Sequence, residues 1–435
     1  MVWFGRVTPG TRRYGVDMPT TRTGAANPYE PGVTTGVTGH PWRASVSASG
    51  AIEPWDRDQE PVRWYVAADD RWHDPAEDTA VRQIRIDGTP VTETRLRIPD
   101  GDAVQRVWTV ADHGGLTIME IENDSARPIA VALTGGGLLT ERPPTDVAVK
   151  GIELDATAIV LPVGHRSSAR VAISHRRRDT GPVPGRVSPV AAVVSGWLTV
   201  CERASRLGLP DQQLVDAVTA ARCDLLLDGP VDNADPLGFL ADVAQIVRLG
   251  DDGDAWLPEV IGPLERIGRE RGPRVDEVLV AVERLAVTAG DERAAGDIAA
   301  LIARRRRDGL ETIASSAPLA ERIAVEALSR GAFVDAVERS LVTGGDVLPG
   351  GFPPPWLGTN FEVHGLPTSA RSTLSFAVRW HGERPAVLWE QTGPPVTLTA
   401  RAIDAAWQSD APSGETLLGA PARPMAPADD PVSFT

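Results

Sequence analysis

The residues best suited to chemistry in this sequence are scattered carboxylates and tryptophans, because the common catalytic motifs are missing from it. The sequence contains no Gly-rich phosphate loop, no His-Glu-x-x-His zinc motif and no Gly-x-Ser-x-Gly nucleophile elbow. Its acidic run Asp251–Asp254 lacks the alternating spacing and the terminal glutamate of a calcium loop. We therefore expect neither a metal nor another cofactor.

Four carboxylates are candidates for a general acid and a general base. Such chemistry needs one carboxyl group held protonated and a second one ionised. Asp235 precedes Pro236, so it is also a candidate for capping a helix. Glu390 directly follows Trp389 and should lie on the opposite, exposed face of a strand. The candidate catalytic residues are Asp232, Asp235, Glu362 and Glu390.

Tryptophan is unusually frequent, which suggests sugar stacking as a second kind of chemistry. The sequence has 12 tryptophans against 7 phenylalanines, and a flat indole face can stack on the apolar face of a pyranose ring. Trp380 and Trp389 alternate with other residues in strand-like runs, so we expect them to fill a core. The candidate substrate-binding residues are Trp356, Asn360, His364 and Arg274.

The segment 80–180 is predicted to form an antiparallel β-sandwich. Apolar residues alternate with others in runs such as Ile84–Ile86, Val104–Val110 and Ile129–Leu133, and turn sequences recur about every eight to twelve residues. The preceding segment 1–79 is rich in proline, glycine and threonine. We expect it to form an irregular, tryptophan-rich lead-in that packs on the sandwich.

The segment 190–345 is predicted to be helical, because apolar residues such as Val275, Leu279 and Val282 recur at helical spacing. Glycines that would end helices stand at positions 208, 229, 250, 272, 290, 309, 331 and 344. About eight helices would then form about four antiparallel hairpins. Such hairpins are typical of either an α/α toroid or an α-solenoid.

Successive antiparallel helices place their loops alternately on two faces, and one of these faces carries the longer loops. The loops on that face are 228–235, 271–275, 309–316 and the segment from 344 onward. Long loops on a rigid scaffold are where binding residues concentrate. We therefore predict that Asp232, Asp235 and Arg274 lie near Trp356 on a ligand-binding face.

The strands return in the segment 346–420, where Leu374, Phe376 and Val378 alternate with other residues. The tail 421–435, rich in proline, alanine and aspartate, is expected to be disordered. The predicted fold class is thus a multidomain α and β protein. It would have an N-terminal antiparallel β-sandwich, a central domain of α/α helical hairpins and a small C-terminal β-domain.

Charge and hydropathy exclude two classes of partner. The net charge of −15 and a pI near 5.0 argue against nucleic acid, which a basic surface would have to neutralise. The longest apolar stretch, Val190–Val200, is broken by Ser195 and Gly196 and falls short of the roughly 20 residues that cross a bilayer. We therefore expect no membrane contact and a cytoplasmic location.

Cys201 and Cys223 lie in apolar, helical surroundings and are expected to be buried residues rather than a disulfide or a metal site.

Four segments resemble uncharacterised actinobacterial proteins that have the layout of glycoside hydrolases and phosphorylases with an α/α toroid, such as glucoamylase-like, trehalase-like and maltose-phosphorylase-like proteins. These segments are Asp87-Gly-Thr-Pro-Val-Thr-Glu-Thr-Arg, Gly101-Asp-Ala-Val-Gln-Arg-Val, Gly115-Leu-Thr-Ile-Met-Glu-Ile-Glu-Asn-Asp-Ser and Leu374-Ser-Phe-Ala-Val-Arg-Trp-His-Gly. The resemblance covers most of residues 80–400. It implies a six-hairpin-like toroid, but the predicted helices are too few to close one, so the resemblance implies an incomplete ring.

The sequence and this resemblance predict a carbohydrate-recognising protein of glycoside-hydrolase-like architecture that is weakly active or non-catalytic. Its partner would be a carbohydrate or a small polyol, and a homo-oligomer is left open. Two alternatives stay open. One is an active inverting glycosidase or glycoside phosphorylase, and the other is an α-solenoid adaptor that binds other proteins.

Overall fold

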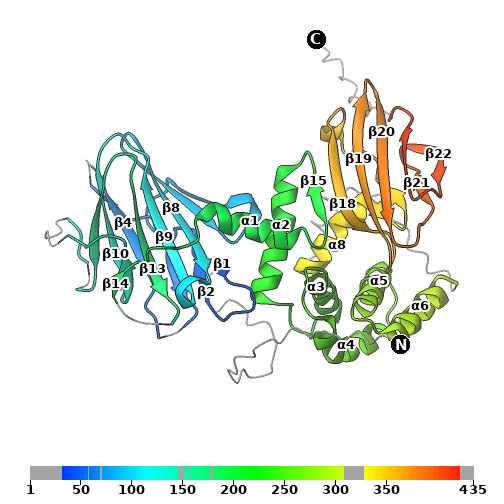
Figure 1. Ribbon diagram of the computed structural model, residues 1–435, viewed down its shortest axis with the longest axis horizontal. Coiled ribbons are helices and arrows are strands. Elements are labelled where there is room, and N and C mark those ends of the chain that lie inside the picture. The colour runs from blue at the N-terminus through cyan, green and yellow to red at the C-terminus, as the bar shows by residue number, and fades with distance from the viewer. Residues whose placement is uncertain are drawn as a thin grey trace, which may run out of the picture.

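The computed structural model describes residues 32–421, apart from residues 57, 69–70, 146–150, 155, 177–179 and 308–327. Figure 1 shows an elongated molecule with a β-sandwich at one end and, at the other end, sheets that stand above a group of helices. Helices α1 (Val190–Cys201) and α2 (Gln212–Asp228) join the two ends. The tail that is predicted to be disordered lies outside the described residues, except for Pro421.

Three sheets build the N-terminal part. The three-stranded sheet consists of β1 (Val33–Gly36), β2 (Arg43–Val46) and β3 (Ile52–Pro54). The four-stranded sheet has the order β12 (Ile159–Val163), β10 (Ile129–Thr134), β4 (Arg63–Ala67) and β5 (Trp72–His73). The seven-stranded sheet has the order β14 (Gly181–Pro182), β11 (Leu138–Thr140), β13 (Ser168–Ser174), β9 (Leu116–Asn123), β8 (Gly101–Val110), β7 (Thr92–Ile98) and β6 (Val81–Arg85). Met119 and Leu161 are buried between the sheets, as the alternation of apolar residues predicts, and Trp64 of the lead-in is buried with them.

The lead-in 1–79 is more regular than its composition suggests. Its described part contributes β1 to β5, and both β4 and β5 belong to the four-stranded sheet. β4 pairs antiparallel with β10, with Trp64 opposite Leu133. The five strands are between two and five residues long, and an alternating pattern of that length does not stand out from a proline-rich background.

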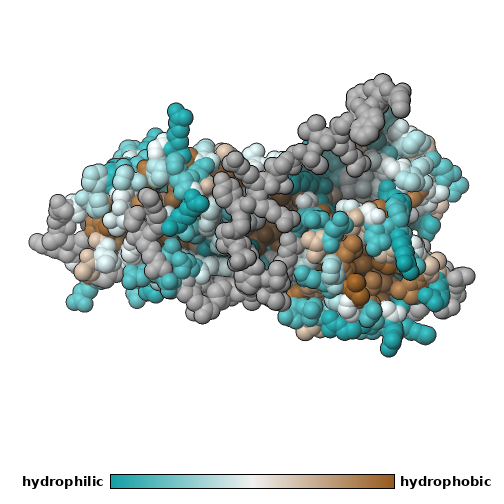
Figure 2. Space-filling model, turned by 60° about the horizontal axis from the view of Figure 1, so that its bottom comes forward, coloured by the Kyte–Doolittle hydropathy of each residue, from teal (hydrophilic) through white to brown (hydrophobic). Residues whose placement is uncertain are grey.

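In the described part of the segment 190–345, seven helices are present, so the helical prediction is correct in type. Besides α1 and α2, they are α3 (Pro236–Arg248), α4 (Gly253–Ile267), α5 (Pro273–Thr288), α6 (Glu292–Arg307) and α8 (Arg330–Leu341). α2 and α3 pack against α8, α3 packs against α5, and α5 packs against α6. Apolar surface gathers over the helical end on the face shown in Figure 2, and Ile261 of α4 is 56% exposed.

The glycines predicted to end helices do so only in part. Gly229, with φ 82°, follows α2 in the left-handed conformation that favours glycine. Gly208 instead ends strand β15 (Arg206–Gly208). Gly331 lies inside α8, where a Cβ atom would come 2.4 Å from the backbone oxygen of Ala241 in α3. The missing side chain at Gly331 therefore serves close helix packing. Gly309 lies outside the described residues.

Two further sheets build the C-terminal part. The five-stranded sheet has the order β15, β18 (Phe361–Pro367), β19 (Thr373–His381), β20 (Arg384–Thr392) and β23 (Ser413–Leu417). The four-stranded sheet has the order β16 (Val342–Thr343), β17 (Asp346–Val347), β21 (Leu398–Ala400) and β22 (Asp404–Ser409). The strands predicted around Leu374 and Trp389 are thus present, and Trp389 is only 8% exposed.

Helices α2 and α8 share an apolar core with the C-terminal sheets, whereas α3 to α6 pack around a separate cluster. Val218 of α2 and Val337 of α8 pack in the same cluster as Val363 of β18. β15, which precedes α2 in the chain, pairs antiparallel with β18, so that Gly208 lies opposite Glu362. The predicted boundary at 345 therefore separates two kinds of secondary structure but not two independent cores.

The sandwich contacts the helices through the short helix η1 (Ile86–Gly88). Gly88 has φ 70°, and a Cβ atom there would lie 2.2 Å from the backbone oxygen of Asp216 in α2. Beside this contact, Arg85 donates two hydrogen bonds to the carboxylate of Asp224, at 2.9 and 3.1 Å. A close backbone approach and a bidentate ion pair thus hold the sandwich against α2.

Candidate functional site

Two of the predicted catalytic carboxylates lie in the loop between α2 and α3, and both are exposed. Asp232 accepts a hydrogen bond from the backbone N–H of Ala234 at 2.7 Å. Asp235 accepts one from the N–H of Gly238 at 3.0 Å and caps α3, with Pro236 in its first turn. Both side chains therefore stabilise local backbone structure, in agreement with the capping interpretation of Asp235.

Glu362 and His364 lie together on β18, within an exposed group of charged side chains. The carboxylate of Glu362 accepts hydrogen bonds from Arg206 at 3.0 Å and from Arg379 at 2.8 Å, and the Nε2 atom of His364 is 3.6 Å from its Oε1 atom. The hydrogen bond from Arg379 and the one with His364 lower the pKa of Glu362. A carboxylate that is held ionised in this way is a poor general acid. Nearby, Asn360 accepts a hydrogen bond from a backbone N–H.

The structure does not bring Glu362 close to Asp232 and Asp235. Glu362 pairs with Gly208, which lies just before α2, whereas Asp232 follows the other end of α2. α2 has 17 residues, and a helix of that length spans about 25 Å. Glu390, the fourth candidate, is exposed on β20, as the alternation with Trp389 predicts. The two carboxyl groups of an inverting glycosidase lie about 6.5–9.5 Å apart, far closer than the two ends of α2.

Trp356 and Arg274 do not form a sugar-binding platform with these residues. Trp356 is 7% exposed and lies in the core, where its ring meets that of Phe361 edge-on at 5.4 Å between centroids. Arg274 lines a cavity between α3, α5 and α8, together with Gln245 and Glu277. This cavity has a volume of about 20 Å³, enough for about one water molecule.

The helical interior contains an ion-pair network that the sequence did not reveal. Glu338 of α8 is 2% exposed and accepts hydrogen bonds from Arg222 of α2 at 2.9 Å and from Arg248 of α3 at 2.6 and 3.0 Å. The hydroxyl of Ser205 also donates to Glu338, at 2.7 Å. Although burial acts in the opposite direction, the charge and hydrogen bonds of Arg248 and Arg222 lower the pKa of Glu338 to about 2. These groups are closed off from any ligand.

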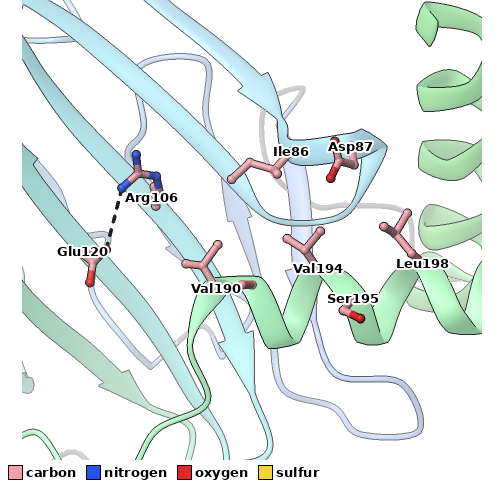
Figure 3. A pocket seen from close by; sticks show the side chains of 9 residues that line it. Ile86, Asp87, Arg106, Glu120, Val190, Val194, Ser195 and Leu198 are labelled. Carbon is pink, nitrogen blue, oxygen red and sulfur yellow. Dashed lines mark ion pairs between the residues drawn. The ribbon is translucent and has the colours of Figure 1, made fainter.

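A wider opening with both polar and apolar walls lies elsewhere, between α1 and the outer face of the seven-stranded sheet. This groove, which we call the α1 groove, has a volume of about 480 Å³, within the usual range for small-molecule sites. Figure 3 shows the Arg106–Glu120 pair at one end and Asp87 and Leu198 at the other. The residues that line it are Ile86, Asp87, Arg106, Glu120, Val190, Ala191, Val194, Ser195 and Leu198.

One end of the α1 groove is formed by a row of alternating charges across the sheet, which we call the charge ladder. Glu93 of β7 pairs with Arg106 of β8, Arg106 with Glu120 of β9, and Glu120 with Arg170 of β13. Arg106 donates to Glu93 at 2.8 Å and to Glu122 at 2.7 Å, while Arg170 donates to Glu120 at 2.5 Å. Opposite charges on directly paired strands stabilise the register of the sheet.

The remaining part of the same sheet face is apolar and is covered by α1. Trp108 and Ile118 are buried there against Val194 of α1. Trp108 donates a hydrogen bond from its indole N–H to the backbone oxygen of Ser188, which leads into α1. The packing of this helix on the tryptophan therefore sets the position of the wall of the α1 groove.

Several polar atoms of the α1 groove have hydrogen-bonding capacity left. Within the described part of the chain, the Oε1 atom of Glu120 has only an ion pair at 3.9 Å, with Arg106. The side chains of Asp87 and Ser195 form no hydrogen bond within those residues. Asp87 also has φ 50°, a conformation that few residues other than glycine adopt. The groove thus presents carboxylate acceptors, a hydroxyl and a guanidinium beside aliphatic side chains.

Sequence reasoning missed the α1 groove because it searched for functional residues in loops. A signal was available in the strand pattern, where charged residues such as Glu93, Arg106, Glu120 and Arg170 take positions on the outer face of consecutive strands. Charged residues on an outer face are usual, however, and do not by themselves indicate a ligand.

Outside these sites, no candidate for a metal centre emerges. Among the described residues, no group of three or more histidine, cysteine, aspartate and glutamate side chains is arranged to hold a metal ion. None of the helices in the described part of the chain combines the length and the apolar composition that crossing a bilayer requires. Comparison with known proteins adds no relative, since no protein-family model matches the chain and no curated protein has a significantly similar sequence.

Proposed function

We propose that this protein recognises a neutral carbohydrate or polyol in the α1 groove and has weak hydrolytic activity or none. The observation that carries the proposal is the set of polar atoms with spare hydrogen-bonding capacity beside an aliphatic wall. A sugar offers hydroxyl groups that both donate and accept, together with apolar C–H faces. Glu120 and Asp87 would accept from hydroxyls, Arg106 would donate to them, and Val194 and Leu198 would contact the C–H face.

The charges favour a neutral ligand over an anion. Arg106 is the one cationic side chain among the lining residues, and it is already paired with Glu93 and Glu122. Glu120 and Asp87 bring two further carboxylates to the groove. A phosphate or carboxylate ligand would therefore meet repulsion without a free cation to offset it. A phosphorolytic reaction at this groove is accordingly not part of the proposal.

Weak or absent hydrolysis is supported by the placement of the carboxylates. The four candidates are exposed or partly exposed and are divided between the two ends of α2 and β20. Glu338, which lies among the helices, has a pKa of about 2 and is sealed by two arginines. A general acid must be protonated and must contact the leaving oxygen, and the lowered pKa values of Glu338 and Glu362 disfavour the first requirement for both groups.

Binding is tested by calorimetry with a panel of gluco- and manno-oligosaccharides and small polyols. We expect binding in the millimolar range or tighter, with a loss of at least tenfold in affinity on Glu120→Gln. Glu122→Gln is the matched control, since Glu122 also contacts Arg106 but does not line the groove. Absence of binding to the whole panel, or equal affinity in wild type and Glu120→Gln, would refute the assignment of the groove.

A second experiment tests where the ligand binds, independently of which ligand it is. The variant Asp232→Ala, Asp235→Ala alters the face that the sequence predicts, and it should leave affinity unchanged. Loss of binding in this variant with retention in Glu120→Gln would move the site to the α2–α3 loop. Because removal of the Asp235 cap costs about 1 kcal/mol of helix stability, the melting temperature must be measured beside the affinity.

Activity is tested with trehalose, maltose, cellobiose and aryl glycosides, with and without inorganic phosphate. We expect little or no released sugar. Robust turnover that disappears on changing Asp232, Asp235, Glu362 or Glu390 would overturn the non-catalytic part of the proposal and would identify the acid or the base.

A further inference from the structure

The two cysteines of the sequence lie side by side, although 22 positions separate them. Cys201 is the last residue of α1, and Cys223 lies in α2. Their Sγ atoms are 3.5 Å apart. The side chains are 3% and 0% exposed, and they pack with Trp197 and Leu227. Tertiary packing has therefore brought together two thiols that the sequence places on different helices.

The surroundings shift the pKa values of the two thiols in opposite directions. The hydrogen bond with Cys223 lowers the pKa of Cys201, and the charge of Arg222 acts in the same direction. Burial raises the pKa of Cys223. The thiolate is the nucleophilic form of cysteine, so Cys201 is the first of the pair to react, with Cys223 in contact as the resolving thiol.

We propose that Cys201 and Cys223 are a redox-reactive pair that a peroxide converts into a disulfide bond between α1 and α2. The Cys201 thiolate attacks one peroxide oxygen and the O–O bond breaks, so that a sulfenic acid and hydroxide form; the hydroxide becomes water by taking up the proton that the Cys201 thiol released. The sulfur of Cys223 then attacks the sulfur of Cys201 and expels its hydroxyl group, which leaves as a second water with the proton of the Cys223 thiol. Two thiols and one hydrogen peroxide thus give one disulfide and two water molecules.

The burial of the pair decides which oxidation products can form. A second protein molecule cannot bring its own thiol to side chains that are 0–3% exposed, so an intramolecular bond is favoured over a disulfide-linked dimer. The contact between the sulfur atoms also favours condensation of the sulfenic acid over its further oxidation. The bond would close the segment 201–223, which contains β15 and most of α2, and would fix the end of α1 to α2. Reductants would reverse it.

The test is titration of the reduced full-length protein with hydrogen peroxide, followed by alkylation under denaturing conditions and intact-mass measurement. We expect a species that is lighter by two hydrogens, takes up no alkylating agent and returns to two alkylated cysteines after reduction. A peptide digest should contain Cys201 linked to Cys223. The melting temperature should rise by about 5 °C on oxidation, because the cross-link constrains the unfolded chain.

The single variants Cys201→Ala and Cys223→Ala serve as controls. Each should keep one alkylatable thiol and lose the reversible rise in melting temperature. Three outcomes would refute the proposal: both wild-type thiols still alkylatable at peroxide concentrations that oxidise a small free thiol, a disulfide-linked dimer as the main product, or conversion to sulfinic acid. Since the first measurement uses the wild-type protein, failure of a variant to fold does not affect the result.

Discussion

The charge ladder of the sandwich and the ion-pair network of the helices use the same two side chains, arginine and glutamate, with opposite consequences. In the ladder, Arg106 and Arg170 are 22% and 43% exposed at their side chains, and Arg106 and Glu120 line an open groove. In the network, Arg222, Arg248 and Glu338 are 4%, 9% and 2% exposed, and their hydrogen bonds are made within the protein. Solvent access, rather than composition, distinguishes the ladder, where we propose that a ligand binds, from the network, which is closed to ligands.

The physical reason is the cost of removing charge from water. A half-exposed pair retains much of its hydration, so a ligand can replace water at modest cost and the pair itself contributes little to stability. A buried pair has already lost its hydration, and each charge depends on its partner. We therefore expect substitutions in the network to affect stability and substitutions in the ladder to affect binding.

The largest expected effect is that of Glu338→Gln. The substitution leaves Arg222 and Arg248 buried without a counter-charge, and removal of one partner of a buried pair costs about 3–5 kcal/mol. Urea unfolding monitored by circular dichroism measures the difference from wild type. A loss of less than 1 kcal/mol would mean that the network behaves like a surface ion pair, and the contrast with the ladder would disappear.

The next effect is a loss of stability in acid. The pKa of Glu338 is about 2 in the folded protein, below its ordinary value of 4.5, so the unfolded chain binds the proton more readily. The contribution of Glu338 is therefore fully present above pH 4.5 and is lost as the pH falls toward 2. A shift of this size corresponds to about 3 kcal/mol.

Urea unfolding at a series of pH values between 6 and 2 checks this expectation. Glu338→Gln should show a shallower decline than wild type, because the group that titrates is gone. Parallel curves for the two proteins would show that other carboxylates dominate the acid sensitivity.

His175 contributes to the pH dependence of stability at higher pH, since burial lowers its pKa to about 4. The stability that comes from neutral His175 is lost as the pH falls from 6.5 toward 4.

The smallest effect is expected for Glu122→Gln, which removes an ion pair beside the charge ladder. Arg106 keeps its hydrogen bond to Glu93, and exposed ion pairs contribute about 0–1 kcal/mol. The free energy of unfolding should change by less than 1 kcal/mol in the same urea assay, with a smaller difference still at high salt. A cost of 3 kcal/mol would show that the ladder is a stabilising element comparable to the buried network.

Local patterns were sufficient for much of the fold. Alternation of apolar residues in 80–180 and around Leu374 predicted strands, and helical spacing in 190–345 predicted helices, because each pattern reports which face of an element is buried. Asp235 before Pro236 predicted a helix start, since a cap depends on residues within one turn. Such features depend on neighbours along the chain and can be derived without knowledge of the fold.

The candidate site could not be derived in this way. The sequence placed Asp232 in a loop and Glu362 near the start of a strand, and it predicted that both lie on one face. In the structure they lie near opposite ends of α2. Trp356 looks like a stacking surface in the sequence and is a core residue in the structure. Sequence spacing does not give the distance between segments that are far apart in the chain. The assignment of Asp232, Glu362 and Trp356 to one site depended on that distance.

Patterns along the chain therefore suffice for the helices, for most of the longer strands, for the acidic charge and for the absence of common catalytic motifs, but not for the short strands β1 to β5 and β15. The contacts of Glu338 with Arg222 and Arg248, of β15 with β18 and of Cys201 with Cys223 arise only when distant segments fold onto one another. The reason is that burial, and with it the energetic value of a charge or a thiol, is set by contacts between distant segments. The same residue types elsewhere in the fold would have different chemistry.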